Sequence, residues 1–530
     1  MKVFMKTALA LLLAALLLAA SAVGVLPVAA DGADTDLLVY EIVDGGAVIT
    51  DCDTEIEGLL VFPEEIEGCP VTAIGEKAFL DCVNLTYVVV PETVTAIGKS
   101  AFYSCKGLIE VVIPASVTEI GDDVFGNCTS LTTIDVEEKN SAFCDVGGIL
   151  FNKDKTQLLR MPSRHGTETY TVPDSVTAIS SRAFFGCSSL KKVTVPNSVT
   201  KIGSSAFHFC PSLTEVILPQ GLTTLEYGLF SSSANLTTVT IPDSVTTIED
   251  KVFASCKSLT AVKLPDSVTT IGKGAFSNCN ALVQVNIPSQ VTAIDDRVFL
   301  HCESLTEITI PDSVKNIGNR AFFFCTKLNK VKMGSSVVTV GHEAFAGCWE
   351  LSNIQLPESL VAIGNYAFQY CQSLAKLEIP AAVTDIGSGA FAGCDKLTAM
   401  ALPEGLLLIG DSTFRDCTKL ASLVMPTKVK KVGFGAFTGC AALKEVSYAG
   451  TAMDRAKIEI GEENQPLDRA TWSCGIIEDN GVKKPAVNID DLPVEGGVTI
   501  SPFLKVVLYI VAIGGAVGFI VLLFLNRSEE

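Results

Sequence analysis

The chain has 530 residues, of which 48% are hydrophobic and 18% charged, and its formal net charge is −20. This length can hold several domains or one long repeat array, and the apolar content can form a large core. The acidic balance argues against nucleic-acid binding, because that function needs a basic surface against the phosphates. It suits a solvated surface that repels other copies of the chain.

The N-terminal segment 1–30 has the features of a secretory signal peptide. Lys2 and Lys6 precede the apolar run 8–20, and small residues ending at Ala30 suit a cleavage site. We therefore expect an exported protein. An uncleaved anchor helix is the alternative interpretation of the same residues.

The C-terminal segment 503–525 is predicted to be a transmembrane helix, because twenty of its residues form an uncharged apolar run, about the length that a bilayer core requires. A cleaved signal peptide and this helix together place residues 31–502 outside the cell and the tail 526–530 in the cytoplasm. Gly514 and Gly518 form a GxxxG pattern that could support helix-mediated self-association.

The segment 479–502 is predicted to be a linker. It contains LPVEG at 492–496, which is similar to the LPxTG signal of sortases but has Glu495 in place of threonine. We interpret it as part of the linker, with cell-wall attachment as the alternative.

A 23-residue repeat fills most of the chain, and internal periods of this size are typical of solenoids. A cysteine follows each repeated phenylalanine by three residues, from Cys82 to Cys440, except where Ser233 stands in its place. A proline also recurs, replaced once by Gly334. The fifteen phenylalanines are Phe79, Phe102, Phe125, Phe184, Phe207, Phe230, Phe253, Phe276, Phe299, Phe322, Phe345, Phe368, Phe391, Phe414 and Phe437.

Each unit reads C-x-x-L-x-x-V-x-I-P-x-x-V-x-x-I-G-x-x-A-F-x-x. In LTAVKLP (259–265), Val262 and Leu264 alternate with Ala261 and Lys263, which predicts a strand with one buried face. Proline ends this strand, because it has no N–H for a ladder. SVTTIG is predicted to form a second short strand, and KGAFSNC a single helical or 3₁₀ turn. Since one unit cannot bury its own apolar face, the units are expected to stack as a solenoid of parallel strands.

The repeat LTEITIPDSVKNIGNRAFFFC (305–325) resembles the BspA-type leucine-rich repeat family of bacterial surface proteins, and the resemblance extends over residues 36–475. It implies an N-terminal cap at 31–78, a leucine-rich repeat array at 79–448 and a C-terminal cap at 449–478. It also implies adhesion to host proteins and to other bacteria.

One insert, at about 129–172, separates Phe125 from Phe184. Within GGILFNKDKTQLLRMP (147–162), the apolar runs on either side of NKDK predict a hairpin. The insert is either a projecting binding loop or a structural elaboration of the array.

The regular cysteines are predicted to form a ladder of buried, unpaired thiols. Zinc sites need ligands clustered at short spacings, whereas here each cysteine is alone in its unit, so we expect no metal and no cofactor. Equivalent Cβ atoms in stacked units should lie about 4.8 Å apart, against the roughly 3.5–4.5 Å of a disulfide. Outside the ladder, Cys52 and Cys69 could pair in the N-terminal cap, and the redox states of Cys144 and Cys474 stay open. The four histidines, in different registers of the repeat, are His165, His208, His301 and His342.

No nucleophile elbow, HExxH motif or P-loop stands in a plausible context, so we expect a binding protein rather than an enzyme. The informative surface is the outward residue between the two buried positions of each long strand. The fifteen positions are Val89, Val112, Asp135, Thr194, Ile217, Thr240, Lys263, Asn286, Thr309, Lys332, Gln355, Glu378, Ala401, Val424 and Ser447.

Seven successive members of this row are polar, and we predict that they bind a ligand on the concave face of the solenoid. They are Thr240, Lys263, Asn286, Thr309, Lys332, Gln355 and Glu378, here called the polar strip. The alternative is that these positions are polar only because they are exposed to solvent. The sequence thus predicts a membrane-anchored cell-surface adhesin for an extracellular protein or glycan. A structural envelope spacer or self-assembling scaffold is the second hypothesis.

Overall fold

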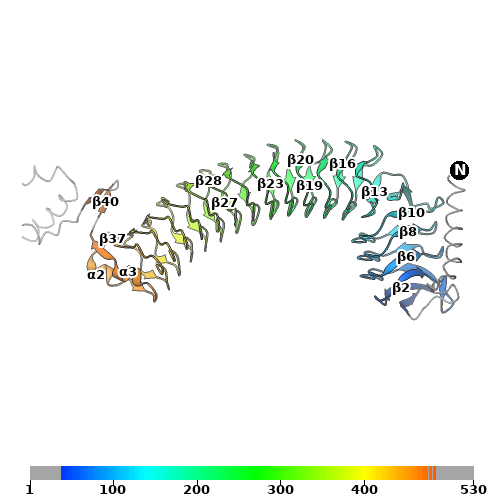
Figure 1. Cartoon of the computed structure of the whole chain (residues 1–530), viewed down its shortest axis with the longest axis horizontal. Helices are drawn as coiled ribbons and strands as arrows, with labels where there is room; N and C mark the ends of the chain where they lie inside the picture. Colours follow the sequence, from blue (N-terminus) through cyan, green and yellow to red (C-terminus); the bar gives the residue numbers. More distant parts are fainter. Residues whose placement is uncertain (1–36, 476, 480–481, 485–530) are drawn as a thin grey trace, which may run out of the picture.

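The computed structural model describes residues 37–475, 477–479 and 482–484, and these form a curved array of stacked coils between two caps (Figure 1). The predicted signal peptide, most of the linker, the transmembrane helix and the GxxxG pair lie outside the described residues. Within the described residues, no helix has the length and apolar character that crossing a membrane requires.

Most coils contribute one strand to a first row of parallel pairs and a two-residue strand to a second row, as the alternation predicts; the coil that carries Glu378 follows the same path without a first-row strand. Neighbours pair at a step of 23 residues, as in Thr309 opposite Lys332. The first row is β6 (Leu85–Val89), β8 (Glu110–Ile113), β10 (Thr133–Val136), β14 (Thr169–Thr171), β16 (Lys192–Thr194), β18 (Glu215–Ile217), β20 (Thr238–Thr240), β22 (Ala261–Val262), β24 (Gln284–Val285), β26 (Glu307–Thr309), β28 (Lys330–Lys332), β30 (Asn353–Ile354), β33 (Ala399–Ala401), β35 (Ser422–Met425) and β37 (Glu445–Tyr448).

The second row consists of two-residue strands that follow the proline of each coil. Its members are β7 (Ala96–Ile97), β9 (Glu119–Ile120), β15 (Ala178–Ile179), β17 (Lys201–Ile202), β19 (Thr224–Leu225), β21 (Thr247–Ile248), β23 (Thr270–Ile271), β25 (Ala293–Ile294), β27 (Asn316–Ile317), β29 (Thr339–Val340), β31 (Ala362–Ile363), β32 (Asp385–Ile386), β34 (Leu408–Ile409) and β36 (Lys431–Val432).

The segment around each phenylalanine is a series of turns, so the prediction of a helical or 3₁₀ turn there was wrong. In every coil the residues two before and two after the phenylalanine have left-handed backbone, such as Lys251 (φ 59°) and Ser255 (φ 61°) around Phe253. These reversals turn alternate N–H groups toward the next coil: Phe253 N–H donates to Ala275 O at 2.8 Å. A continuous helix would keep those bonds within the coil.

The phenylalanine rings form a buried column along the array. From Phe184 to Phe437, eleven successive ring pairs stack with centroids 4.8–5.8 Å apart and ring planes within 17° of parallel. Phe79, Phe102 and Phe125 form a shorter column of the same kind. Burying such rings is among the largest contributions that a side chain makes to a core.

The cysteines form a second column, and the structure explains why serine can replace one of them. Twelve thiols donate to the carbonyl oxygen of the phenylalanine 26 residues earlier, at 3.0–3.3 Å. Ser233 Oγ makes the same bond, to Phe207 O, at 2.7 Å. The repeat therefore requires a small buried donor at this position, which either residue supplies.

All eighteen cysteines are free, so the pair that Cys52 and Cys69 could have formed is absent. Cys52 lies instead against Cys82, the first thiol of the ladder, with the two sulfur atoms 2.7 Å apart. Cys69 is half-buried at the start of β5 (Cys69–Ile74), and Cys144 and Cys474 are also half-buried.

The insert contains the predicted hairpin, but it does not project. β12 (Ile149–Asn152) and β13 (Gln157–Arg160) pair antiparallel, and β11 (Phe143–Val146) pairs with β12. Leu150 belongs to the apolar core on the N-terminal side, whereas Ile149 and Phe151 belong to the larger core that follows. The insert is thus a buried junction between two stretches of array, where Figure 1 shows a bend.

Both ends of the array are covered. At the N-terminal end the cap strands are β1 (Leu38–Val43), β2 (Gly46–Cys52), β3 (Gly58–Val61), β4 (Glu65–Ile66) and β5 (Cys69–Ile74), and Phe62 lies edge-on against Phe79. At the other end, buried Asn464 accepts from Phe437 N–H at 3.0 Å, in place of the carbonyl that a further coil would offer. The C-terminal elements are α2 (Ala452–Arg455), β38 (Glu459–Ile460), α3 (Gln465–Arg469), β39 (Thr471–Cys474), β40 (Ile477–Asp479) and β41 (Val482–Lys484).

Replacing Ser233 by alanine should destabilise the array by about 1–3 kcal/mol, because it leaves the buried Phe207 carbonyl without a donor. Ser233→Cys restores the bond found in the other coils and should cost less than Ser233→Ala. Urea unfolding followed by circular dichroism measures both. Equal losses in the two variants would contradict the role given to this hydrogen bond.

The thiol ladder should resist alkylation in the folded protein. Burial raises the pKa of Cys279 and of Cys394 from the ordinary 9.0 to about 12. Because the fold favours the neutral thiol, this contribution to stability is complete below about pH 9 and is lost as the pH rises from about 9 to about 12. Iodoacetamide at pH 8.5 should modify the thirteen ladder thiols from Cys105 to Cys440 of reduced protein only in denaturant, and the urea midpoint should fall above pH 9. Rapid native alkylation along the ladder would contradict this prediction.

Glutathione disulfide should link Cys52 to Cys82, since these two sulfur atoms are in contact. The exchange forms one protein disulfide and releases two molecules of reduced glutathione. Peptide mapping by mass spectrometry under non-reducing conditions identifies the linked peptides. A Cys52–Cys69 peptide as the main product would contradict the prediction.

Candidate binding surface

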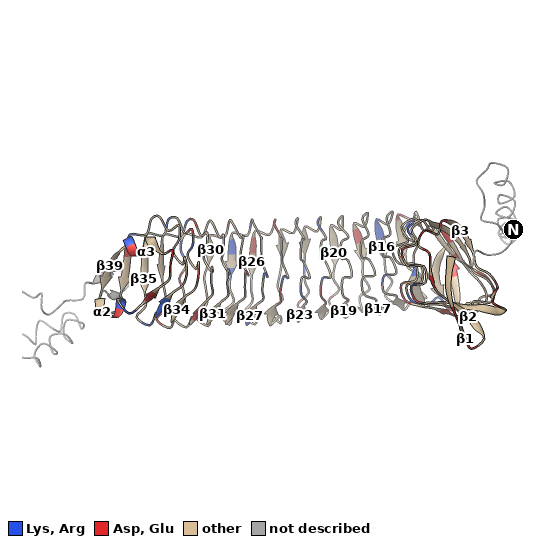
Figure 2. Ribbon diagram, turned by 90° about the horizontal axis from the view of Figure 1, so that it is seen from below, with Lys and Arg blue, Asp and Glu red and all other residues tan. Residues whose placement is uncertain are grey.

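The seven side chains of the polar strip are all exposed, at the outward register position of the first strand row. Figure 2 views the array from the side toward which its ends bend in Figure 1 and shows the two strand rows side by side. Of the fifteen outward positions that the repeat predicts, only Ser447 is buried, at 5% exposure, beside the C-terminal cap. The repeat register therefore predicted correctly that the polar strip is exposed, whereas Asp135, Thr194 and Val424 elsewhere in the row are half-buried.

Asn286 differs from the other members of the polar strip, because its amide is already used inside the protein. Its Oδ1 accepts from Leu264 N–H and its Nδ2 donates to Leu264 O, both at 2.8 Å. In other coils a main-chain carbonyl oxygen at this register accepts the hydrogen bond from the equivalent N–H group. For example, Lys332 O accepts from Ile310 N–H at 2.8 Å. Asn286 therefore holds two coils together rather than facing a ligand with free hydrogen-bonding groups.

A second outward row, two residues earlier in the same strands, was missed by the sequence reasoning. Its members beside the strip are all exposed: Thr238, Ala261, Gln284, Glu307, Lys330, Asn353 and Lys376. The signal was present, since side chains two apart in a strand share a face. The surface is therefore two side chains wide along each coil.

Charge is arranged on this surface as ion pairs and separate ammonium groups. Lys330 lies 3.8 Å from Glu307, and Lys376 lies 2.7 Å from Glu378. The hydrogen bond from Lys376 lowers the pKa of the Glu378 carboxyl. Lys263 and Lys332 form no ion pair with a carboxylate of the described residues, so their ammonium groups are the available cations of the strip.

A groove of about 740 Å³ borders the strip where the chain enters the strands. Five consecutive coils each contribute the two residues that directly follow the cysteine. Trp349 is the large exposed side chain among them, with 45% of its surface accessible. The lining residues are Thr326, Lys327, Trp349, Glu350, Gln372, Ser373, Asp395, Lys396, Thr418 and Lys419. Residue types vary at these two positions, so the repeat alone gave no signal for the groove.

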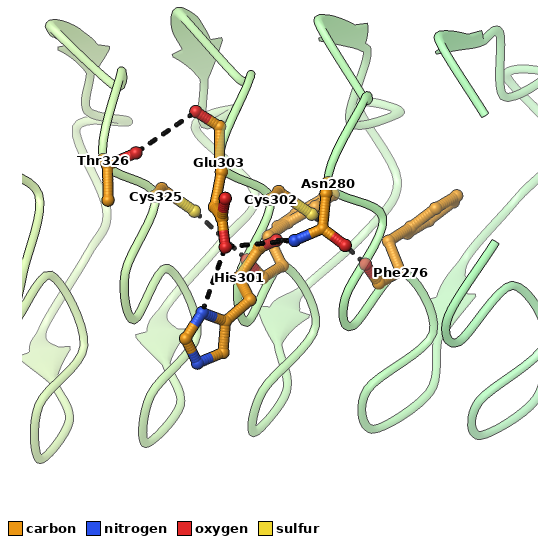
Figure 3. A network of polar contacts seen from close by, with 8 residues as sticks. Phe276, Asn280, His301, Cys302, Glu303, Cys325 and Thr326 are labelled. Carbon is orange, nitrogen blue, oxygen red and sulfur yellow. Dashed lines mark hydrogen bonds and ion pairs between the residues drawn. The ribbon is translucent and has the colours of Figure 1, made fainter. Parts of the chain in front are cut away.

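The coils before the groove carry a polar network at the same register, shown in Figure 3. Asn280 Nδ2 donates to Glu303 Oε1 at 3.0 Å, and Thr326 Oγ1 donates to the main-chain oxygen of Glu303 at 3.4 Å. His301 Nδ1 lies 3.7 Å from the same carboxylate oxygen of Glu303. Along this edge the polar groups thus contact one another from coil to coil, and the groove begins at Thr326, where the network ends.

In the described part of the chain, no group of three or more His, Cys, Asp or Glu side chains is placed to hold a metal ion. The exposed arrangement just described consists of hydrogen-bonding groups, ammonium groups and one tryptophan on a rigid sheet. Such an arrangement can bind a large ligand through many weak contacts.

The sequence profile described as BspA type Leucine rich repeat region matches residues 65–157, 163–282, 227–352 and 338–454. Comparison with proteins of curated function gives no significant match.

Solved structures of bacterial leucine-rich repeat proteins are similar to the chain. A leucine-rich repeat protein from Bacteroides ovatus is 27% identical over 83% of this chain and 98% of its own, with a TM-score of 0.49. A leucine rich cell surface protein from Faecalibacterium prausnitzii is 28% identical over 82% of this chain and 99% of its own, with a TM-score of 0.38. The leucine-rich repeat protein of T. pallidum is 30% identical over 42% of this chain and 88% of its own, with a TM-score of 0.27.

Proposed function

Because the chain belongs to the BspA-type leucine-rich repeat family, we propose that it is a membrane-anchored cell-surface protein that binds an extracellular protein or glycan. The polar strip and its neighbouring row form the binding surface. One observation carries this proposal: a run of seven polar side chains stands exposed along one face of the stacked coils, and five of them have hydrogen-bonding groups that are not used within the array.

The environment of the strip supports recognition by this face. The outward residues before the strip include exposed apolar side chains, Val89, Val112 and Ile217. The change from apolar to polar residues along the row is therefore not accompanied by a change in solvent exposure. This argues against solvent exposure alone as the reason why the strip is polar. The net charge of −20 opposes nucleic acid as the ligand.

The covered ends oppose open-ended assembly of the array. Solenoids that end in an uncovered coil expose apolar surface and unpaired backbone groups, and capping units prevent this. Here Phe62 covers the ring column at one end and Asn464 satisfies the backbone at the other. These caps favour the display of a lateral binding surface over growth into a scaffold.

The test compares two triple variants of residues 31–500. In the first, Lys263, Lys332 and Glu378 of the strip are replaced by alanine. In the matched control, Lys201, Lys431 and Asp385 are replaced by alanine, which removes the same charges from exposed positions of the second strand row. Biolayer interferometry against host matrix proteins and immobilised glycans measures the affinity.

We expect saturable binding that weakens about tenfold or more in the strip variant, equivalent to about 1.4 kcal/mol, and is unchanged in the control. Equal binding by all three proteins would place recognition elsewhere. An absence of binding, accompanied by concentration-dependent association, would instead favour the structural spacer.

A further inference from the structure

Aromatic side chains are concentrated in the turns that lead, along the chain, into the groove-lining residues. Tyr366 and Tyr370 expose 39% and 48% of their surface, and Trp349 exposes 45%. Phe324 is half-buried, with its ring centroid 6.0 Å from that of Trp349. Four aromatic residues thus occupy three consecutive coils next to a polar groove.

Three of these residues are held in an unfavourable backbone conformation. Phe324, Tyr366 and Tyr370 have φ values of 56°, 57° and 57°. Left-handed backbone is easily adopted by glycine but is unfavourable for bulky side chains. Every coil has this backbone at the same two positions, so the conformation follows from the fold and not from the groove. What distinguishes these coils is that aromatic rings occupy the positions in neighbouring coils and leave 39% and 48% of Tyr366 and Tyr370 exposed.

The next coil is adapted to these rings. Phe324, Tyr366 and Tyr370 are each followed 23 residues later by a glycine: Gly347, Gly389 and Gly393. A Cβ atom on these glycines would lie 2.8, 2.3 and 2.4 Å from the respective ring. Each ring therefore rests on the backbone of the following coil, where a side chain would displace it.

We propose that the groove binds a glycan chain, with one sugar ring packed against Trp349, which lines the groove, and a further ring against exposed Tyr370, two residues before the lining residue Gln372. Aromatic rings supply a flat apolar face, which matches the C–H face of a sugar, while the groove supplies partners for its hydroxyl groups. Those partners are the side chains of Gln372, Ser373 and Asp395.

The geometry of the groove favours a linear polymer of amphipathic units. Stacked coils place equivalent positions about 4.8 Å apart, so the lining repeats at short, regular steps along five coils. An amphipathic helix would require a continuous apolar groove, whereas here one tryptophan stands among polar residues. The inference deepens the proposed function by naming a glycan as the ligand class. It rests on that function only for the premise that the array is displayed outside the cell, where it meets such ligands.

The test is affinity electrophoresis of the full chain, solubilised in a polyoxyethylene detergent that carries no sugar. Each gel contains one polysaccharide: dextran, xylan, pectin or hyaluronate. We expect at least one gel to retard the protein, and Trp349→Ala or Tyr370→Ala to raise the apparent Kd at least tenfold. The matched control is Phe209→Ala, which removes a 51% exposed aromatic ring with φ 56° at the register of Tyr370 but in a distant coil.

Circular dichroism and thermal unfolding confirm that each variant folds, and Trp349→Phe, which keeps a ring, should retain part of the retardation. The proposal is overturned if no polysaccharide retards the protein, or if the Trp349 and Tyr370 variants behave like the Phe209 control. The alanine variant of Lys263, Lys332 and Glu378 separates this proposal from the previous one. This variant should still be retarded by the polysaccharide gel, even if it loses the binding measured by biolayer interferometry.

Discussion

The hydrogen bond from one coil's cysteine to the previous coil's phenylalanine carbonyl is the interaction on which the rest of the structure depends. It occurs together with a left-handed backbone on both sides of the phenylalanine in the same coil, as at Lys251 and Ser255 in the coil of Cys256. The same left-handed backbone points Phe253 inward to stack on its neighbours and sends its N–H to the next coil. Local strain is thus offset by contacts that only stacked coils can make.

Because this interaction repeats at a fixed step, the side chains at the outward positions are not needed to hold the coils together. The strands present side chains in straight rows, and residues in those rows can change without disturbing the core. Asn286 shows the limit of that freedom, since its amide replaces a main-chain bond. Elsewhere in the strip and in the groove, the array acts as a rigid support for the groups that we propose contact other molecules.

The sequence predicted the solenoid, the strand rows, the hairpin at 149–160 and the exposure of the strip, because each follows from a period of 2 or of 23 residues. It did not predict the left-handed turns, since residues as different as Arg320, Phe324 and Gly389 occupy them and local propensity opposes most of these. The Cys52–Cys82 contact was missed, and the sequence left open whether the insert projects or is part of the array. Both depend on how segments outside the repeat pack against the array, and this packing leaves no periodic pattern in the sequence. Trp349 could have been singled out by its rarity alone, as one of two tryptophans.

Hydroxyl-radical footprinting of the full chain, free and bound to a captured ligand, tests the central claim most directly. That claim is that recognition lies on the strand face and its adjoining groove. The account predicts protection of Trp349 and Lys332 on binding, with Phe209 and Lys201 oxidised as in the free protein. Protection confined to the caps, or to the second strand row around Lys201, would contradict it.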